Sequence, residues 1–391
     1  MAEHWTNWSG SVTAHPRQIH RPRTEADLVD VVDAHAPEDT IRAVGAGHSF
    51  TRLGETDDVL VATDALTGVE SVDAEAGRAT ARAGTSLADL NRDLAAAGVA
   101  MENLGDIDRQ HLAGAMLTGT HGTGREFGIL ATQIARLRLV TAAGDVLDLG
   151  PEDGDRFQAA RVSLGALGLV SSITLEVLPA YDLEVAHRMV DLDVALANFE
   201  DLLAANRHAE FFWWPTAGAA EVKTIDRPGE ARTPALPGET VTEVDSGPSH
   251  AVFPTERDVK FNEMEYGVPA ADGPDVMAEI RDLVESRDDV EFPVEYRYVQ
   301  GDEVPLSPAY GRDTVFIAVH KSNEKPYADF FAAAEAIFRS YDGRPHWGKH
   351  HTRSSTDLAD LYPEWERFQA VRRALDPDGV FLNDYLEAVF G

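Results

Sequence analysis

The sequence contains no cysteine, and this absence removes several kinds of chemistry at once. A chain of 391 residues without cysteine cannot hold disulfide bonds, thiolate-bound metals or a cysteine nucleophile. It also lacks the run of about 18 apolar residues that a membrane-spanning helix requires. Its first residues, Met-Ala-Glu-His-Trp, have neither the basic nor the apolar region of a signal peptide. We therefore expect a soluble, cytoplasmic protein with no membrane span, and the length suggests two domains.

Basic residues are scarce. Lysine and arginine number 34 against 67 acidic residues, so the formal net charge is −33. Such a charge would repel phosphate, which argues against a nucleic-acid partner. Disorder is not expected, because 43% of the residues are hydrophobic and the acids are scattered. We interpret the acids as a solvated surface suited to high salt, with a salt-loving source as a hypothesis. Only five residues are lysines, so a lysine in an unusual local context becomes a candidate site residue.

Residues 42–50 form a glycine-rich turn after a short apolar strand, with His48 at the tip. Gly45 and Gly47 permit torsions and close approaches that a Cβ would block. Successive N–H groups in such a turn can hold phosphate oxygens. The turn is not a dinucleotide-binding fingerprint, because Phe50 stands where the third glycine would be. The alternative is a structural turn with an incidental histidine.

A second glycine-rich stretch, Leu112–Gly124, combines four glycines with threonines and a histidine and has no charged residue. We expect its backbone to lie flat against a large planar or phosphorylated ligand. The alternative is a tight loop between core strands. Further along the chain, residues 226–252 are rich in proline, glycine, threonine and acids, and they predict a long surface loop.

Glu295 and Arg297 are two residues apart on a strand predicted over Val294–Val299, so both project from one face. A carboxylate beside a guanidinium can orient a polyol and stabilise a developing anion. A structural salt bridge is the alternative. Lys349 lies in an aromatic, histidine-rich turn, and it is the candidate cation for a substrate oxygen or an anionic cofactor.

Two other chemistries are not favoured. His346, His350 and His351 raise a zinc hypothesis, but Gly348 weakens a helical pairing and no His-Glu-x-x-His pattern occurs. We therefore predict no metal site. No Gly-x-Ser-x-Gly elbow occurs either, which argues against a serine hydrolase.

Taken together, the ordered motifs resemble those of the flavin-dependent sugar-1,4-lactone oxidases, relatives of alditol oxidase in the vanillyl-alcohol-oxidase superfamily. The resemblance covers nearly the whole chain. Its motifs are Asn7-Trp-Ser, Val44-Gly-Ala-Gly-His-Ser49, Asn103-Leu-Gly105, Thr118-Gly-Thr-His-Gly-Thr-Gly124, Gly128-Ile-Leu-Ala-Thr-Gln133, Phe157-Gln-Ala-Ala-Arg161, Phe212-Trp-Trp214, Met264-Glu-Tyr266, Glu295-Tyr-Arg297, Leu306-Ser-Pro308, Arg344-Pro-His-Trp-Gly-Lys349 and Asp376-Pro-Asp-Gly-Val-Phe-Leu-Asn383.

The resemblance implies an α+β, two-domain FAD-binding fold of the vanillyl-alcohol-oxidase type with a mixed-sheet substrate domain. The expected parts are an FAD-binding domain (1–178), a substrate or cap domain (179–343) and a C-terminal segment (344–391) that completes the active site. It also implies a covalent bond from His48 to the flavin. The implied FAD-binding residues are Val44, Gly45, Ala46, Gly47, His48, Ser49, Gly105, Ala113, Gly114, Thr118, Gly119, Thr120, His121, Gly122 and Ile173.

On the substrate side, the resemblance implies catalytic roles for Glu295, Arg297 and Lys349, with His320 as a looser match. The implied reaction is hydride transfer from C2 of an aldono-1,4-lactone to the flavin, with O2 as acceptor and H2O2 as product. An alditol oxidase, a lactone dehydrogenase with another acceptor, and a flavin carrier without turnover stay open. The sequence gives neither the physiological sugar nor the oligomeric state.

Overall fold

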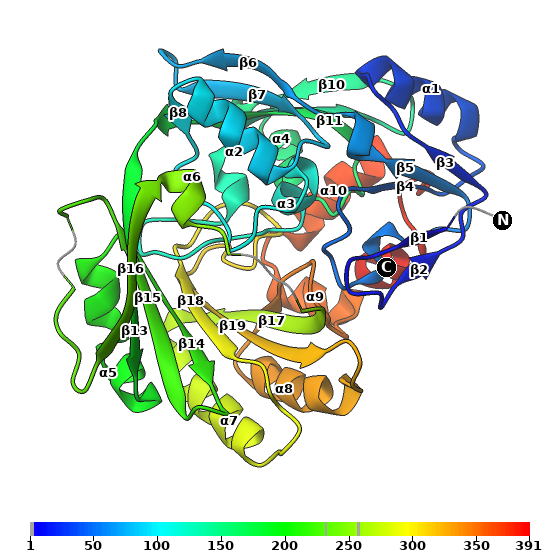
Figure 1. The fold of residues 1–391 in the computed structure, drawn as a ribbon. Coiled ribbons are helices and arrows are strands. Elements are labelled where there is room, and N and C mark those ends of the chain that lie inside the picture. Colours follow the sequence, from blue (N-terminus) through cyan, green and yellow to red (C-terminus); the bar gives the residue numbers. More distant parts are fainter. Residues whose placement is uncertain (1–3, 231–232, 256–258) are drawn as a thin grey trace.

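The computed structural model describes residues 4–230, 233–255 and 259–391. In Figure 1 the N-terminal part (blue to cyan) lies above a broad sheet (green to orange), and the last helices return to the N-terminal part. Buried hydrophobic side chains form two large clusters, one mainly in each part. Within the described ranges, no helix combines the length and apolarity needed to cross a membrane.

The N-terminal part begins with the antiparallel pair β1–β2, and a three-stranded parallel sheet in the order β3–β5–β4 follows. Helix α1 between its strands starts at a capping box, because the Thr24 hydroxyl accepts from the Asp27 N–H and the Asp27 carboxylate accepts from the Thr24 N–H. Strand β4 then leads directly into the glycine turn. The bounds are β1 Trp5–Thr6, β2 Thr13–Ala14, β3 Gln18–His20, α1 Glu25–His35, β4 Ile41–Val44 and β5 Val59–Ala62.

A five-stranded antiparallel sheet in the order β10–β9–β11–β7–β6 completes this part. The stretch Leu112–Gly124, predicted as flat backbone, begins instead as helix α3. Leu112, Ala115 and Met116 lie on one face of that helix and are buried, so core packing outweighs the low helix propensity of Gly114. The bounds are β6 Val69–Asp73, β7 Arg78–Arg82, α2 Leu87–Ala96, β8 Val99–Ala100, α3 Leu112–Leu117, β9 Ile134–Val140, β10 Val146–Leu149, α4 Asp155–Arg161, β11 Leu169–Glu176 and β12 Leu178–Pro179.

An eight-stranded antiparallel sheet in the order β16–β13–β15–β14–β18–β19–β17–β20 forms the lower part of Figure 1. Helices α5, α7 and α8 cover one face of this sheet with buried leucine, valine and phenylalanine side chains. The other face turns toward the N-terminal part. The bounds are β13 Asp182–Val190, α5 Leu192–Ala205, β14 His208–Trp214, β15 Ala219–Asp226, β16 Thr240–Pro248, β17 Phe261–Pro269, α7 Gly273–Glu285, β18 Val294–Val299, β19 Thr314–Ser322, α8 Ala328–Ser340 and β20 Arg344–Pro345.

The prediction of a surface loop over residues 226–252 is wrong for its second half; positions 231–232 lie outside the described residues. Strand β16 pairs with β13 at the sheet edge, and the short helix α6 (Ser249–Val252) follows. Almost every residue of β16 is exposed. Its polar composition therefore reflects an edge strand that is exposed to solvent on both faces. Composition alone does not distinguish such a strand from a loop.

The C-terminal segment packs back on the N-terminal part. The Ile41 N–H donates to the Val380 carbonyl at 2.9 Å, and the Asn383 side chain donates to the carbonyls of Arg52 (2.8 Å) and Glu55 (2.7 Å). The first contact joins the C-terminal segment to β4, which precedes the glycine turn. The contacts of Asn383 join it to residues 52–55, which follow that turn. The helices here are α9 Ser355–Leu361, α10 Trp365–Leu375 and α11 Asp384–Phe390.

Candidate active site

The glycine turn after β4 is held in a tight setting. A Cβ on Gly45 would lie 2.9 Å from Cβ of His111, and Gly47 has φ of +72°, so neither position accommodates a larger residue without strain. Buried Arg42 anchors the strand by donating to the carbonyls of Leu53 and Leu164, both at 2.8 Å. Burial lowers the pKa of Arg42 to about 10.

A cavity, here called the glycine cavity, lies along this turn and α3. Backbone from both glycine-rich segments therefore faces one space, as expected for a nucleotide-like ligand. Its lining consists of Trp5, Arg42, Ala43, Val44, Gly45, Ala46, Gly47, His48, Ser49, Thr51, Leu53, Gly54, Thr63, Gln110, His111, Ala113, Gly114, Leu117, Thr118, Leu164, Gly165, Gly168 and Val170.

A second cavity of about 320 Å³, here called the central cavity, lies between the two parts of the chain. His48, Ser49, Gln110 and Thr118 line both cavities, so the two adjoin at the tip of the glycine turn. The lining of the central cavity consists of Trp8, His48, Ser49, Phe50, Asp106, Ile107, Arg109, Gln110, Thr118, Thr120, His121, Thr255, Phe261, Glu263, Glu265, Glu295, Arg297, His320, His346, Gly348 and Lys349.

His48 stands at this junction. Its ring stacks on Trp8 with centroids 5.7 Å apart and planes at 15°, and its Nδ1 atom is buried without a hydrogen-bond partner. Burial, followed by the charges of Lys349 and His111, lowers the pKa of His48 to about 4. The ring is therefore neutral at pH 7 and presents an unpaired nitrogen, which is unusual for a buried polar atom.

Arg297 and Glu295 form the centre of a buried charge network. The Arg297 guanidinium lies 2.7 Å from Glu295, 3.0 Å from Glu210 and 3.6 Å from Asp106. Burial alone would lower the pKa of Arg297, but these three carboxylates outweigh it and raise the pKa. Burial raises the pKa of Glu295, against the opposing effect of Arg297. The predicted pair is thus formed, and its arginine stays charged.

Lys223 belongs to the same network and was missed by the sequence reasoning. Its ammonium lies 3.3 Å from Asp106 and 3.2 Å from Glu210, and its side chain is only 5% exposed. The signal was present, because the chain has only five lysines. The residue sits in an ordinary alternating strand, however, and its partners come from distant segments.

Lys349 and His320 complete the predicted catalytic set. The Lys349 ammonium contacts the Glu263 carboxylate and lies 5.3 Å from the centroid of Phe50. His320 donates from Nδ1 to the Pro293 carbonyl at 2.9 Å, while its Nε2 faces Glu263 and Glu295, each at 3.7 Å. All four predicted catalytic residues therefore line the central cavity.

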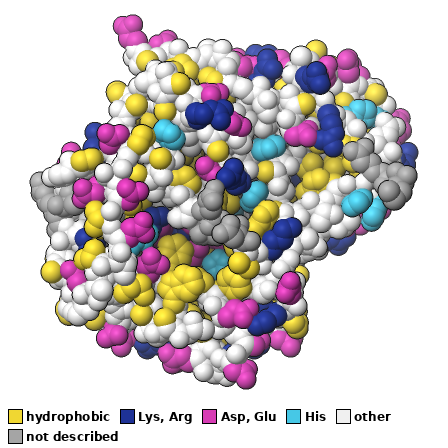
Figure 2. Space-filling model, viewed as in Figure 1, with side chains coloured by type: hydrophobic (Ala, Val, Ile, Leu, Met, Phe, Trp, Pro, Cys, Tyr) yellow, Lys and Arg dark blue, Asp and Glu magenta, His cyan; other side chains and the backbone are white. Residues whose placement is uncertain are grey.

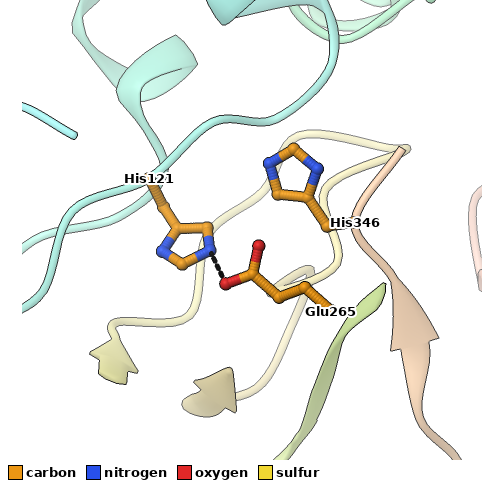
Figure 3. Close-up of side chains that lie close together, drawn as sticks. All are labelled: His121, Glu265 and His346. Atoms are coloured by element: carbon orange, nitrogen blue, oxygen red, sulfur yellow. Dashed lines mark ion pairs between the residues drawn. The ribbon is translucent and has the colours of Figure 1, made fainter. Parts of the chain in front are cut away.

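A further buried cluster, His121, Glu265 and His346, also lines this cavity (Figure 3). His121 donates from Nδ1 to the Gly122 carbonyl at 2.9 Å, and its Nε2 lies 3.2 Å from Glu265. Nδ1 of His346 accepts the Gly348 N–H at 3.0 Å, so the hydrogen of the neutral ring is on Nε2. Burial lowers the pKa of His346 to about 3, which keeps that ring neutral.

The three histidines considered for zinc do not converge. His346 joins the cluster above, His350 meets Asn262 at 3.0 Å, and His351 meets Tyr385 at 2.7 Å. Among the residues that the structure describes, two groups could bring three ligand atoms together: His121 with Glu265 and His346, and Glu263 with Glu295 and His320. In both groups the carboxylates already contact a histidine, lysine or arginine. The absence of a metal stays a prediction.

The predicted FAD-binding residues divide between the two cavities. Val44 to Ser49, Ala113, Gly114 and Thr118 line the glycine cavity, while Thr120 and His121 line the central one. Within the described ranges, Gly105, Gly119, Gly122 and Ile173 line neither. Ile173 is fully buried in β11, and a Cβ on Gly122 would lie 2.2 Å from the Leu104 carbonyl oxygen.

Comparison with known proteins defines the class first. The fold is similar to that of cholesterol oxidase from B. sterolicum, with a TM-score of 0.86 at 17% identity over 99% of this chain and 96% of that one. A family model described as an FAD binding domain matches residues 16–150. The predicted FAD-binding fold of the vanillyl-alcohol-oxidase type is therefore confirmed, and the chain is of the FAD-binding class.

The particular family follows from the rest of the chain. The family model described as D-arabinono-1,4-lactone oxidase matches residues 173–242 and 235–389, and the chain belongs to that family. L-gulono-1,4-lactone dehydrogenase of Mycobacterium tuberculosis is 39% identical over the full length of both chains. Alditol oxidase of a Streptomyces species is 34% identical, with 97% of each chain covered. L-gulonolactone oxidase of Bos taurus is 29% identical over 98% of this chain and 97% of that one.

The residues present fit FAD. The glycine cavity offers backbone at Gly45, Gly47 and Gly114, where a Cβ would strain the turn or enter the cavity. His48, whose Nδ1 has no hydrogen-bond partner, lines both this cavity and the central one.

Proposed function

We propose that this protein oxidises the C2 carbinol of an aldono-1,4-lactone, with O2 as the final electron acceptor and H2O2 as the product. FAD, when bound, supplies the hydride acceptor for this reaction. The observation that carries the proposal is that Arg297 and Lys349 face the same cavity as His48. The names of the matching family and of two lactone-oxidising relatives support the choice of substrate.

In this proposal Arg297 and Lys349 stabilise negative charge on the substrate oxygen. Both line one cavity, Arg297 with a buried side chain and Lys349 with a side chain that is 20% exposed, and a charge–charge interaction in such a partly buried setting is stronger than in bulk water. Arg297 is held by Glu295, Glu210 and Asp106, so its guanidinium is oriented before substrate arrives. Lys349 is held by Glu263. Fixed donors of this kind avoid a reorganisation cost during the reaction.

His320 is our proposed acceptor of the hydroxyl proton. Because Nδ1 donates to the Pro293 carbonyl, the neutral ring has its lone pair on Nε2. Nε2 faces the carboxylates of Glu263 and Glu295, each at 3.7 Å, so a proton taken up there has two acceptors close by. Glu295 thus serves two groups, Arg297 and His320.

We further propose that a ring nitrogen of His48 would hold the flavin covalently, through a methyl carbon of the flavin ring. The C–H bond broken there would release a proton, and the electron pair would pass through the flavin to O2. The neutral ring, its unpaired nitrogen and its place between the two cavities support this attachment. Gly45 to Ser49, Gly114 and Thr118 would hold the rest of the cofactor, since they line the glycine cavity.

Two variants of this function are supported by relatives. An alditol oxidase is 34% identical, so a terminal carbinol of an open-chain polyol is a second candidate substrate. A relative named a dehydrogenase is 39% identical, so an acceptor other than O2 is a second candidate oxidant.

The test uses the purified holoenzyme with a panel of aldono-1,4-lactones and alditols, following peroxide release and dye reduction in parallel. Oxidation of a lactone with peroxide matching it one to one is the expected result. Dye reduction without peroxide release would show that the electron acceptor is not O2. Turnover of alditols alone would show that the substrate is an alditol and not a lactone. A flavin-loaded enzyme that oxidises neither class would contradict the proposal.

We also propose that the acidic surface adapts the protein to high salt. Acidic side chains are scattered over the face shown in Figure 2, in keeping with the net charge of −33. Salt would screen their mutual repulsion. The melting temperature should therefore rise steadily as KCl is added, and a melting temperature independent of salt would contradict this.

A further inference from the structure

A third cavity of about 400 Å³, here called the side cavity, adjoins the central one on the face of the eight-stranded sheet. Asp106, Thr255, Phe261, Glu295 and His320 line both cavities. A molecule that touches the proposed catalytic groups can therefore extend into the side cavity. Beyond these shared residues its lining includes His187, Phe212, Trp214 and Glu221.

The alternation of β14 sets the character of this space. Glu210, Phe212 and Trp214 project from one face of the strand, because side chains two residues apart point the same way. Glu210 is 5% exposed and Trp214 is 36% exposed. This face of β14 is therefore buried and charged at Glu210, which contacts Arg297, and is aromatic and partly exposed at Trp214.

The open end combines aromatic surface with a polar pair. Phe212 on β14 is paired with Glu221 on the neighbouring strand β15. Trp214 lies two residues further along β14, on the same face as Phe212. His187 holds Glu221 through a contact of 2.9 Å from Nδ1 to the carboxylate. The pKa of Glu221 is lowered, first by the hydrogen bond from His187 and also by one from Trp214, so this side chain is an ionised acceptor. Figure 2 shows hydrophobic side chains exposed over the region of β14, β18 and β19.

We propose that the side cavity is a second sugar-binding subsite, which takes the further glycosyl ring of an aldonolactone or alditol substrate whose oxidised unit occupies the central cavity. The C–H face of a sugar ring would lie against Trp214 and Phe212, while its hydroxyls donate to the Glu221 carboxylate. Apolar walls with a few fixed polar groups are the usual composition of a small-molecule site. The proposal rests on the proposed function, since it extends the same substrate.

The test compares the holoenzyme on sorbitol against maltitol and lactitol, and on glucono-1,4-lactone against the 1,4-lactones of gentiobionic and melibionic acid, whose second sugar is on O6 and leaves O4 free to close the lactone. The measured quantity is the ratio of kcat/KM for the glycosylated compound to that for its parent. In Trp214→Ala this ratio should fall at least about tenfold, which corresponds to the loss of one good contact. Trp214→Phe keeps an aromatic face, so its ratio should lie between those of the wild type and Trp214→Ala. Val244→Ala, at an exposed position of the edge strand β16, is the matched control and should leave the ratio unchanged.

Binding is followed separately by tryptophan fluorescence during titration with maltitol, in wild type and Trp214→Phe. Saturable quenching that weakens in Glu221→Gln supports the subsite even if turnover is absent. A ratio that stays within about twofold in Trp214→Ala, or no saturable maltitol binding, overturns the subsite. Failure to oxidise any parent compound contradicts the proposed function instead, so the two failures are distinguishable.

Discussion

The carboxylate of Glu295 lies 2.7 Å from the guanidinium of Arg297, and both side chains project from one face of β18 into the central cavity. Glu210 on the neighbouring strand holds the same guanidinium from the side, at 3.0 Å. This arginine is therefore fixed by two strands at once. A guanidinium held in this way can present its remaining donors to a substrate oxygen without first changing its rotamer.

Replacement of Arg297 by Lys should lower kcat roughly 10²- to 10³-fold, because one positioned donor to a developing oxyanion is lost while the charge remains. The measurement is steady-state turnover, with flavin content and circular dichroism recorded alongside. Arg281→Lys is the control, since Arg281 on helix α7 pairs with Asp193 of helix α5 and does not line the central cavity. Unchanged kcat in Arg297→Lys would remove this side chain from the chemistry.

Replacement of His48 by Ala should abolish covalent attachment of the flavin. After acid precipitation the wild-type pellet should stay yellow, while the variant should release its flavin to the supernatant. His15→Ala, at an exposed position, is the control. A yellow pellet from His48→Ala would place the attachment elsewhere, and a colourless wild-type pellet would show that the flavin is not covalently bound.

Replacement of Lys223 by Met should destabilise the protein by about 3–5 kcal/mol, because Asp106 and Glu210 would lose a partner in a buried setting. The measurement is urea unfolding at pH 7. Lys325→Met is the matched control: its ion pair with Glu291 is about half exposed, and such pairs contribute about 0–1 kcal/mol. Equal effects of the two variants would contradict the role assigned to the buried network.

The glycine turn, the strand over Val294–Val299 and the pairing of Glu295 with Arg297 were predictable from the sequence, because each depends on local torsions or on the two-residue period of a strand. Helix α3 was not predicted, since Gly114 suggests a loop and only the buried face of the helix explains its formation. The edge strand β16 was not predicted either, because its pairing with β13 is nonlocal.

The wider charge network was hidden for the same reason. Lys223, Glu210 and Arg297 lie side by side because β15, β14 and β18 are neighbours in one register. Their sequence positions reveal the face that each side chain takes on its own strand, but not which strands are adjacent. Glu263 and Glu265 likewise project from one face of β17. Their place in the site depends on the pairing of β17 with β19, which puts Glu263 opposite His320.

Stability should fall as the pH drops from about 6.5 toward 4. Burial lowers the pKa of His208 and His346 to about 3 and that of His350 and His351 to about 4, while in the unfolded chain these rings titrate near 6.5. The unfolded state therefore binds more protons in this window, so acid favours unfolding. Each ring contributes up to about 1.4 kcal/mol per pH unit.

His208→Gln should make the free energy of unfolding depend less steeply on pH, by about the contribution of one histidine. The measurement is urea unfolding at several pH values between 4 and 7. His208 is fully buried and stacks on Phe127 with centroids 4.7 Å apart, so its charging is costly. His15→Gln, at an exposed position, is the control. A slope unchanged in His208→Gln would contradict the linkage.

Gly114→Ala should have opposite effects on the empty protein and on flavin binding. Gly114 lies inside helix α3, and a Cβ there would meet no atom within 4 Å, so alanine should stabilise the apoprotein by about 0.5–1 kcal/mol. The same Cβ would enter the glycine cavity and should weaken the binding of FAD. Both quantities are measured in a His48→Ala background, by thermal unfolding without flavin and by fluorescence titration with FAD. Higher stability with unchanged FAD affinity would show that the cofactor does not lie against this turn of α3, whereas lower stability would show that the position is more crowded than its geometry indicates.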